Sequence, residues 1–313
     1  MNDLMPRESE IGMEVAAWIA ALGLGRTTKI GALDVAPLVS SRLALAPDVL
    51  AHQALADGRL QVIEKGAGDV NTLVALSTAP VPIVILEGDM LIGAKQNRMV
   101  AHTVVIGPGM KVEIPVGCME RGRWDARHGR FAAGAGVAES RMRRDLKKDV
   151  MASRRHGHAA SIDQSRLWEQ VSQELVSEQM SSPTSDFDVV ARRRERDRAP
   201  LRDVRPVPGQ VGLIAMHEGD LVAMEVVGHP ATWEPLFGRV LASLAPEVAD
   251  RPRGRRRRGS GEWMGAIRDA ALRLSDRPAV GIGRDVELET RHLIGSGVWM
   301  GDRMAHLSVY APG

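Results

Sequence analysis

The chain has 313 residues, of which 44% are hydrophobic and 26% charged, a composition typical of globular proteins with a substantial core. Its formal net charge of +2 excludes a protein whose whole surface is built to bind nucleic acid. A single cysteine, Cys118, excludes an intramolecular disulfide and any zinc site made of several cysteines.

The N-terminal residues carry no pattern of a targeting or membrane-spanning segment. MNDLMPRESE is polar and acidic, whereas a signal peptide begins basic and then turns apolar. The apolar run that follows, IGMEVAAWIAALGLG, is interrupted by Glu14 and is too short to cross a bilayer. We therefore expect residues 1–26 to form a helical extension of a cytoplasmic protein that does not contact a membrane.

A β-rich half is predicted over residues 27–128. TKIGALDVAPLVSS and LQVIEK are strand candidates, and DVLAHQALAD between them favours a short helix. Further on, NTLVALS, PVPIVILEG, HTVVIGP and KVEIPVGCM are short runs rich in Val and Ile, separated by Pro, Gly and Asp. This spacing is typical of an antiparallel meander or a sandwich, because connections so short favour hairpins over helical crossovers.

An α+β half is predicted over residues 129–313. ESRMRRDLKKDVM and SIDQSRLWEQVSQELVSEQM repeat apolar residues every four positions, which indicates amphipathic helices. GQVGLIAMHEGDLVAMEVVG predicts a hairpin, ATWEPLFGRVLASLAPEV and EWMGAIRDAALRLS predict helices, and the C-terminal segment from Val280 predicts three strands. The arginine-rich ARRRERDRAPLRD is interpreted as a solvated connection between these elements.

Together these elements predict an α+β fold, in which an N-terminal antiparallel meander or sandwich-like sheet packs with a C-terminal α+β unit. We expect residues 27–313 to form a single domain made of the two halves 27–128 and 129–313. Residues 1–26 would precede this domain as an extension. No internal repeat divides the chain further.

The stretch from Glu87 to Trp124 is the candidate functional centre. Four polar residues stand together between two apolar strands: Lys95, Gln96, Asn97 and Arg98. Side chains with so many hydrogen-bond donors are costly to bury unless water or a ligand pairs with them. We therefore predict that these four residues bind a ligand.

The second motif of this stretch is CMERGRW. In an extended strand, Cys118 and Glu120 share one face, where a thiol and a carboxylate could act as nucleophile and general acid/base, or as part of a metal site. Arg123 could hold Glu120 or an anionic ligand through two hydrogen bonds. Trp124 could lie beneath a base or another ring.

Each of these residues also has a structural interpretation. A buried cysteine such as Cys118 is more often a small hydrophobic residue than a nucleophile. A reactive thiol would need a base, and the histidines available for this role are His102, His128 and His306. The side chains of the Gln-Asn-Arg run could form hydrogen bonds with backbone groups at strand ends and turns. Glu120 could form a purely structural ion pair with Arg98 or Arg123.

The same motifs carry a resemblance to a known family. Glu87-Gly88, GAKQNR at 93–98 and PVGCMERGRW at 115–124 resemble the signature of the ARG- and rhodanese-phosphatase-superfamily-associated protein domain, and weaker similarity continues through VGLIAMHEGDLVAMEVVG to HLSVY. This bacterial and archaeal family is named for its association with ADP-ribosylglycohydrolases and rhodanese-like phosphatases and has no established activity. By association, the resemblance implies a cytoplasmic role near ADP-ribose or NAD metabolism. His102 and the basic segment 251–261 depart from the family pattern.

Two arginine-rich segments are candidate partner-binding surfaces. The first contains Arg192, Arg193, Arg194, Arg196 and Arg198. Its interleaved acidic residues indicate a solvated helix face. The second contains Arg253, Arg255, Arg256, Arg257 and Arg258. Because it is unbalanced, it could contact nucleic acid or an acidic partner.

Other signals are weaker. His156 and His158 could share a metal ion on a strand, but in a polar loop a solvated turn is the simpler interpretation. No Walker A, GxSxG, HExxH or EF-hand pattern is present, so the sequence identifies neither a cofactor nor a metal. Three hypotheses remain: small-molecule or nucleotide binding at the two motifs, a hydrolase or transferase that uses Glu120 and Cys118, and an interaction scaffold with arginine-rich loops.

Overall fold

The largest sheet of the protein draws its strands from both ends of the chain. Its strands are β1 (Leu22–Leu24), β2 (Thr28–Ile30), β3 (Leu33–Ser40), β13 (Gln210–His217), β14 (Asp220–Val227), β15 (Ser275–Pro278), β16 (Arg284–Thr290), β17 (Leu293–Trp299) and β18 (Met304–Tyr310). They lie in the order β1-β3-β13-β14-β18-β17-β16-β15, with β2 paired to β3, and all neighbours are antiparallel. The structure is a computed structural model that describes residues 10–41, 44–125, 129–197, 201, 204–244 and 258–312.

Two smaller sheets form the other half of the molecule. The first contains β5 (Leu60–Glu64), β6 (Thr72–Ser77), β8 (Asp89–Gly93), β9 (Arg98–Val100), β11 (Lys111–Cys118) and β12 (Phe131–Val137), in the antiparallel order β12-β8-β9-β11-β6-β5. The second contains β4 (Val49–Leu50), β7 (Ile83–Ile85) and β10 (Val104–Ile106), in the order β10-β7-β4. Within it, only the pairing of β4 with β7 is parallel.

Helices pack on both faces of the large sheet and against the smaller sheets. They are α1 (Glu10–Ala20), α2 (Ala51–Ala56), α3 (Ser140–Arg155), α4 (Gln164–Ser177), α5 (Phe187–Asp197), α6 (Pro230–Leu244) and α7 (Ser260–Ala271). One hydrophobic cluster joins α1 and α7 to one face of the sheet, and a second joins α6 to the opposite face. Alternation along β18 explains this arrangement, because Leu307 and Val309 face the α1/α7 side whereas Tyr310 faces the other side.

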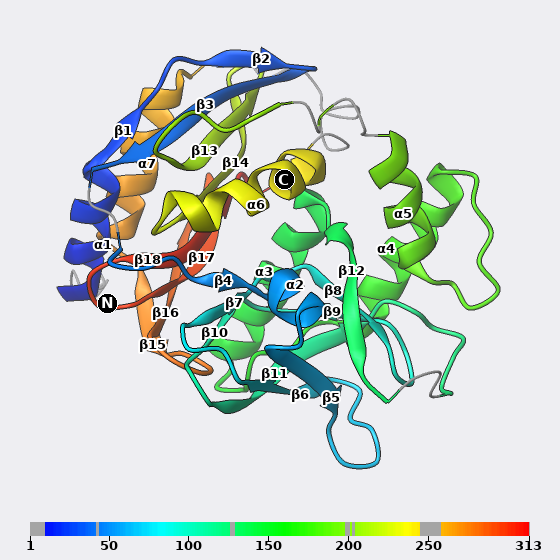
Figure 1. Ribbon diagram of the computed structural model, residues 1–313. Coiled ribbons are helices and arrows are strands. Elements are labelled where there is room, and N and C mark those ends of the chain that lie inside the picture. Colours follow the sequence, from blue (N-terminus) through cyan, green and yellow to red (C-terminus); the bar gives the residue numbers. More distant parts are fainter. Residues whose placement is uncertain are drawn as a thin grey trace, which may run out of the picture.

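The predicted α+β fold class is confirmed, and most of the predicted elements are present. The antiparallel pairing expected from the Val/Ile-rich runs is also found, although these strands divide between two sheets. The chain pairs differently at its N-terminal end, where β3 joins β13 of the large sheet. Figure 1 shows the blue strand β3 lying beside β13. Strand propensity carries no information about which strands will pair over such a distance.

Residues 191–197 of the arginine-rich segment, which we interpreted both as a solvated connection and as a solvated helix face, belong to helix α5. Arg192 is exposed and pairs with Asp188 at 2.6 Å, as expected of a solvated face. Arg194 instead is buried, and its guanidinium pairs with Glu139, Glu174 and Glu178. The acidic partners come from other elements, so the sequence near α5 could not reveal that one of its arginines is buried.

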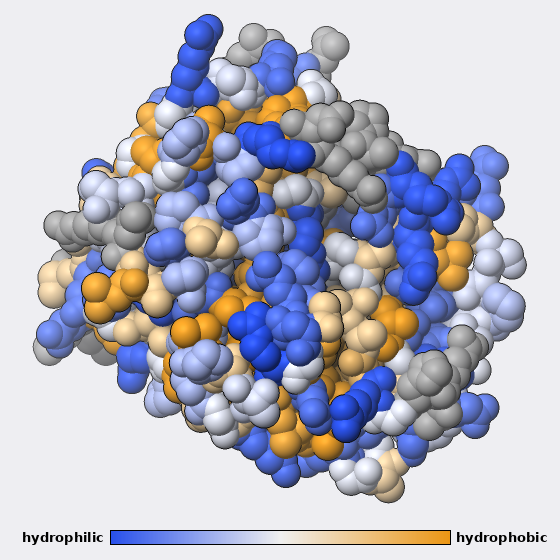
Figure 2. Space-filling view, viewed as in Figure 1, coloured by the Kyte–Doolittle hydropathy of each residue, from blue (hydrophilic) through white to orange (hydrophobic). Residues whose placement is uncertain are grey.

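The second arginine-rich segment lies almost wholly outside the described residues. Of its five arginines, the structure describes only Arg258, whose guanidinium lies 4.8 Å from the centre of the Trp263 ring. Figure 2 shows that the face seen in Figure 1 carries mainly hydrophilic residues, with hydrophobic residues in small separate groups. Within the described ranges, no helix is both long enough and apolar enough to cross a membrane.

Candidate functional site

The two sequence motifs meet at one end of the six-stranded sheet. The turn from β8 to β9 carries GAKQNR, and the residues that follow β11 carry CMERGRW. This turn needs unusual backbone angles, because Gly93 has φ +134° and Ala94 has φ +41°. A side chain at Gly93 would also lie only 2.7 Å from the carbonyl oxygen of Arg130, so only glycine fits there. The Asn97 side chain closes the turn, since its Oδ1 accepts a hydrogen bond from the Gly93 N–H at 3.0 Å.

A buried guanidinium lies at the centre of these loops. Arg98 has no exposed surface, and its Nη1 donates to Gln96 Oε1 at 2.9 Å and to Cys118 Sγ at 3.1 Å. Its Nη2 lies 3.8 Å from Glu64 Oε2, which is within ion-pair range but beyond a hydrogen bond. Among the described residues, neither Nη2 nor Nε of Arg98 has a hydrogen-bond partner. Buried donors without partners are costly, and they are the groups that a ligand or a water molecule would satisfy.

An exposed aromatic ring lies next to this guanidinium. Trp124 is 45% exposed, although tryptophan side chains are mostly buried in folded proteins. The Lys95 Nζ lies 5.2 Å from the centre of the Trp124 ring, and the Arg98 Cζ lies 5.6 Å from it. Val70, whose carbonyl oxygen lies 3.7 Å from Cys118 Sγ, is 42% exposed. The loops therefore present apolar surface and one further cation, Lys95, beside a buried arginine.

A saturated ion pair holds the loops together. Arg123 donates from Nε and Nη2 to the Glu120 carboxylate, with a shortest distance of 2.6 Å, and from Nη1 to the Ala94 carbonyl at 2.6 Å. Glu120 also accepts from Thr184 Oγ1 at 2.8 Å and from the Asn97 N–H at 3.1 Å. Burial alone would raise the pKa of Glu120, but the hydrogen bonds from Arg123, Thr184 and Asn97 outweigh it and lower the pKa. Glu120 is therefore ionised at neutral pH, with both oxygens occupied.

Cys118 is enclosed rather than presented to solvent. Its side chain is 1% exposed, and burial raises the pKa of the thiol although the nearby Arg98 lowers it. The Gln164 side chain brackets the cysteine backbone, accepting from its N–H and donating to its carbonyl, both at 2.8 Å. Of the three histidines considered as its base, His102 pairs with Asp285 at 3.0 Å and His306 with Glu225 at 2.7 Å. His128 lies outside the described residues.

One carboxylate of these loops was missed by the sequence analysis. Asp186 precedes α5, and its Oδ2 accepts a hydrogen bond from Asn97 Nδ2 at 2.8 Å. Burial raises its pKa to about 6, and the nearby Glu120 charge adds to this rise. The segment SPTSDFD, which contains it, resembles an ordinary connection in sequence. Backbone contacts between the two segments bring these carboxylates together: the bridge between Glu120 and Asp186, and the hydrogen bond from the Phe187 N–H to the Met119 carbonyl at 3.0 Å.

We call this group the loop site. It contains all eight residues predicted from the two motifs: Lys95, Gln96, Asn97, Arg98, Cys118, Glu120, Arg123 and Trp124. The structure adds Glu64, Gln164, Thr184 and Asp186. In the part of the chain that the structure describes, no three His, Cys, Asp or Glu side chains stand close enough to share a metal ion.

Glu87, at the start of the predicted centre, belongs to a different cluster. It lies between the halves of the molecule, where Lys147 and Arg143 of α3 pair with its carboxylate and Ser308 donates to it at 2.8 Å. Arg143 also pairs with Glu225 of β14. We call this cluster the buried network; its ionisable members are Glu87, Arg143, Lys147, Glu225, His306 and Tyr310, each no more than 2% exposed.

The charges of the buried network are balanced within it. Burial would raise the pKa of Glu225, but Arg143 and His306 outweigh it and hold the pKa at about 2. Burial would likewise raise the pKa of Glu87, which Lys147 and Arg143 lower. For Lys147 burial is stronger than its attraction to Glu87, so its pKa is lowered. Because the network joins Glu87 of the first half to α3 and β18 of the second, it links the two halves.

The fold and the loop site together define an α+β protein whose polar loops gather at one end of its smaller β half. The chain belongs to the family described as the ARG and Rhodanese-Phosphatase-superfamily-associated Protein domain, whose sequence model matches residues 21–310. This confirms the resemblance found in the two motifs. The match runs from just before β1 to the end of β18, so the family domain includes both halves. Comparisons with curated proteins and with solved structures gave no match.

Proposed function

We propose that the loop site binds a small anionic molecule that carries a planar ring, of the nucleotide class. The observation that carries this proposal is the Arg98 guanidinium, which is fully buried and has two nitrogens without a hydrogen-bond partner among the described residues. Guanidinium groups bind phosphate and carboxylate oxygens through paired hydrogen bonds. An anionic group seated here would replace the incomplete contact of Arg98 with Glu64.

The surroundings of Arg98 support the ring and the charge of this ligand. Trp124 offers an exposed aromatic face on which a base could stack, a contact that contributes about 1–3 kcal/mol per base in other proteins. Lys95 adds a second positive charge beside the same ring. ADP-ribose and NAD combine a purine ring with a pyrophosphate. They are also the ligands suggested by the family's association with ADP-ribosylglycohydrolases.

Binding agrees with the described geometry better than catalysis by Cys118 and Glu120. The thiol is buried and its pKa is raised, whereas a nucleophilic cysteine needs a lowered pKa and an accessible sulfur. Glu120 has a lowered pKa and no free oxygen, whereas a general acid needs a raised pKa. These two residues are better suited to shaping the loops.

Acid–base catalysis at Asp186 is a second candidate function. The pKa of Asp186 is raised to about 6, whereas the pKa of the neighbouring Glu120 is lowered. Asp186 therefore holds a proton more readily than Glu120 does, and carboxylate pairs of this kind are found in hydrolases. In this case Asp186→Asn would abolish turnover of a bound nucleotide and leave its affinity unchanged. Equal turnover in the variant and the wild type would remove this candidate.

The binding proposal is tested by isothermal titration calorimetry with ADP-ribose, NAD and ribose 5-phosphate. Trp124→Ala should weaken binding of the two nucleotides about tenfold, since it removes a stacking contact, and should affect ribose 5-phosphate little. Trp168→Ala is a matched control, because Trp168 also contacts an arginine, Arg121 at 5.3 Å, but lies outside the loop site. Its affinities should equal those of the wild type.

The stability of the variants separates a binding site from a purely structural one. Because Trp124 is 45% exposed, Trp124→Ala should lower the free energy of unfolding by about 1–2 kcal/mol in urea titrations, less than the roughly 3–5 kcal/mol of a buried tryptophan. Wild-type protein that binds none of the three ligands at millimolar concentration would refute the proposal. Equal loss of affinity in the Trp124 and Trp168 variants would refute it as well.

A further inference from the structure

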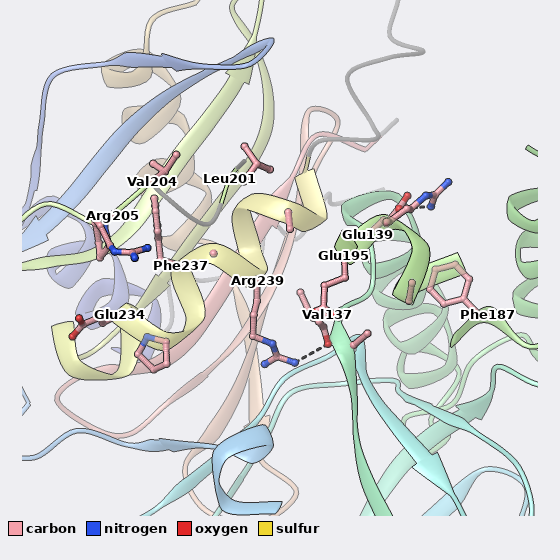
Figure 3. Close-up of a pocket in the computed structure, with 18 residues that line it drawn as sticks. Val137, Glu139, Phe187, Glu195, Leu201, Val204, Arg205, Glu234, Phe237 and Arg239 are labelled. Atoms are coloured by element: carbon pink, nitrogen blue, oxygen red, sulfur yellow. Dashed lines mark hydrogen bonds and ion pairs between the residues drawn. The ribbon is translucent and has the colours of Figure 1, made fainter. Parts of the chain in front are cut away.

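A cavity of about 440 Å³ lies away from the loop site, between α5, α6 and the end of β12. Figure 3 shows Phe237 and Arg239 reaching it from α6, Phe187 and Glu195 from α5, and Leu201 and Val204 from the segment before β13. Its volume lies within the range of small-molecule sites, which is roughly 300–1,000 Å³. None of the eight residues predicted from the sequence lines it.

The wall of the cavity is mainly apolar. The apolar side chains that line it include Val137, Phe187, Leu201, Val204, Phe237 and Ala242. Glu195 and Glu234 also line it but are exposed, where water and salt screen their charges. Glu139 lies at its edge and pairs with Arg194. Arg194, the partner of Glu139, and the exposed Arg205 line the cavity as well. The body of a ligand here would therefore contact mainly hydrocarbon.

The guanidinium of Arg239 is held in place at the floor of the cavity. The Arg239 side chain runs from α6 to β12, where its Nη2 donates to the Gly136 carbonyl at 2.7 Å (Figure 3). The same Nη2 donates to Asp89 Oδ1 at 2.9 Å. Its Nη1 lies 2.9 Å from His52 Nδ1. Burial, together with the Arg239 charge, lowers the pKa of His52 to about 4, so at neutral pH this ring nitrogen accepts the hydrogen bond. These contacts use three of the five guanidinium N–H groups and leave two for a ligand.

We propose that this cavity is a second ligand site, which binds a small organic acid with an aromatic or branched apolar body. The acid group would accept hydrogen bonds from the remaining N–H groups of Arg239, and the apolar body would fill the space between Phe237 and the α5 side. Because Asp89, Gly136 and His52 already hold the guanidinium in position, little conformational entropy is lost when a ligand binds. The proposal does not depend on the loop site.

A glycine on α6 offers a way to fill the cavity without disturbing the fold. Gly238 lines the cavity, and a Cβ added there would meet no atom within 4 Å. Gly238→Leu should therefore occupy the space that the ligand needs, and it also replaces glycine by a better helix former. Gly265→Leu in α7 is the matched control, because it is also a helical glycine with no atom within 4 Å of an added Cβ.

The probes are 1-anilinonaphthalene-8-sulfonate and N-phenyl-1-naphthylamine, which share one ring system and differ by the sulfonate. We expect the wild type and Gly265→Leu to bind the sulfonate probe at one site, about tenfold more tightly than the neutral probe, because charge-assisted hydrogen bonds to Arg239 add affinity. Gly238→Leu should weaken binding of the sulfonate probe by at least about tenfold. Fluorescence titration measures each affinity, and a thermal melt checks that each variant is folded.

Two results would overturn the proposal. Unchanged binding of the sulfonate probe in Gly238→Leu would mean that it binds elsewhere, and equal affinity for both probes would mean that no acid group is recognised. If Gly238→Leu fails to fold, Ala242→Leu fills the same cavity from the next turn of α6 and must give the same loss. Trp124→Ala should leave the probe affinities unchanged, so failure here is distinguishable from failure of the proposed function.

Discussion

Replacing Glu225 by glutamine measures what the buried network contributes to stability. The variant leaves Arg143 without its closest carboxylate, and because glutamine keeps only one carbonyl oxygen it cannot accept from both His306 and Tyr310, which bond to different oxygens of Glu225. Arg143 keeps only the weaker contact with Glu87, at 3.4 Å. Removing one partner of a buried ion pair typically costs about 3–5 kcal/mol, because the remaining charge stays buried. We expect a loss of about 3 kcal/mol in the free energy of unfolding, measured by urea denaturation at pH 7.

The pH dependence of this loss provides an independent check on its size. The folded-state pKa of Glu225 is about 2, below its ordinary value of 4.5, a difference that corresponds to about 3 kcal/mol. For a carboxylate with a lowered pKa, the stabilisation is present above the unfolded-state pKa and is lost as the pH falls through the folded-state pKa. The difference between wild type and Glu225→Gln should therefore shrink as the pH falls from 5 to about 2.

An exposed ion pair serves as the control. Lys29 and Asp34 pair at 2.8 Å on the surface, with the lysine side chain 72% exposed, and Lys29→Gln should cost no more than about 1 kcal/mol. If Glu225→Gln costs no more than Lys29→Gln, the buried network contributes no more than a surface pair and the reasoning is wrong. A loss that stays constant between pH 7 and pH 2 would refute the assignment to the Glu225 charge.

Three further predictions concern single positions. Gly281→Ala should lower the free energy of unfolding by more than about 2 kcal/mol, whereas Gly58→Ala should lower it by about 1 kcal/mol. Both glycines have positive φ, but only at Gly281 would an added Cβ meet a backbone oxygen, that of Val105 at 2.1 Å. Equal losses in urea unfolding would contradict this prediction. Cys118 should react with iodoacetamide at least about tenfold more slowly than a free thiol until the protein is unfolded, since burial raises its pKa, and fast labelling of folded protein would be the contrary result. Because burial raises the folded-state pKa of Asp186 from 3.8 to about 6, its stabilisation is lost as the pH rises through this range. Asp186→Asn should therefore gain stability relative to wild type between pH 4 and pH 7, and a pH-independent difference would argue against it.

Local sequence patterns predicted the positions of the helices and strands better than they predicted which segments lie together in the fold. The GAKQNR turn and the CMERGRW segment follow strands that terminate at the same end of a sheet, so antiparallel pairing could be expected to bring the two segments together. Gln164, Thr184 and Asp186 could not be assigned to the same site, because they come from segments that carry no strand or ligand pattern. Side chains from loops far apart in sequence meet only through tertiary packing.

The buried network was missed because its pattern resembles that of an ordinary surface strand. In β18, His306 and Ser308 alternate with Leu307 and Val309, which normally predicts one buried face and one solvated face. The polar face is instead covered by α3, whose Arg143 and Lys147 supply the opposite charges. Alternation predicts which side chains share a face, and only tertiary structure decides whether that face meets water or a charged helix.

Glu87 and Trp124 begin and end a stretch that is continuous in sequence but divided in space. The first and last residues of strand β8, Asp89 and Gly93, are about 13 Å apart, so the segments at its two ends meet different neighbours. Before it, Glu87 is enclosed by the charges of α3 and the large sheet; after it, Arg98 lies beneath an exposed ring. Because the two environments differ, substitution of Glu87 should lower stability, whereas substitution of Trp124 should lower affinity. The polar residues of this stretch therefore lie in two separate environments, and stability and binding measurements can distinguish their contributions.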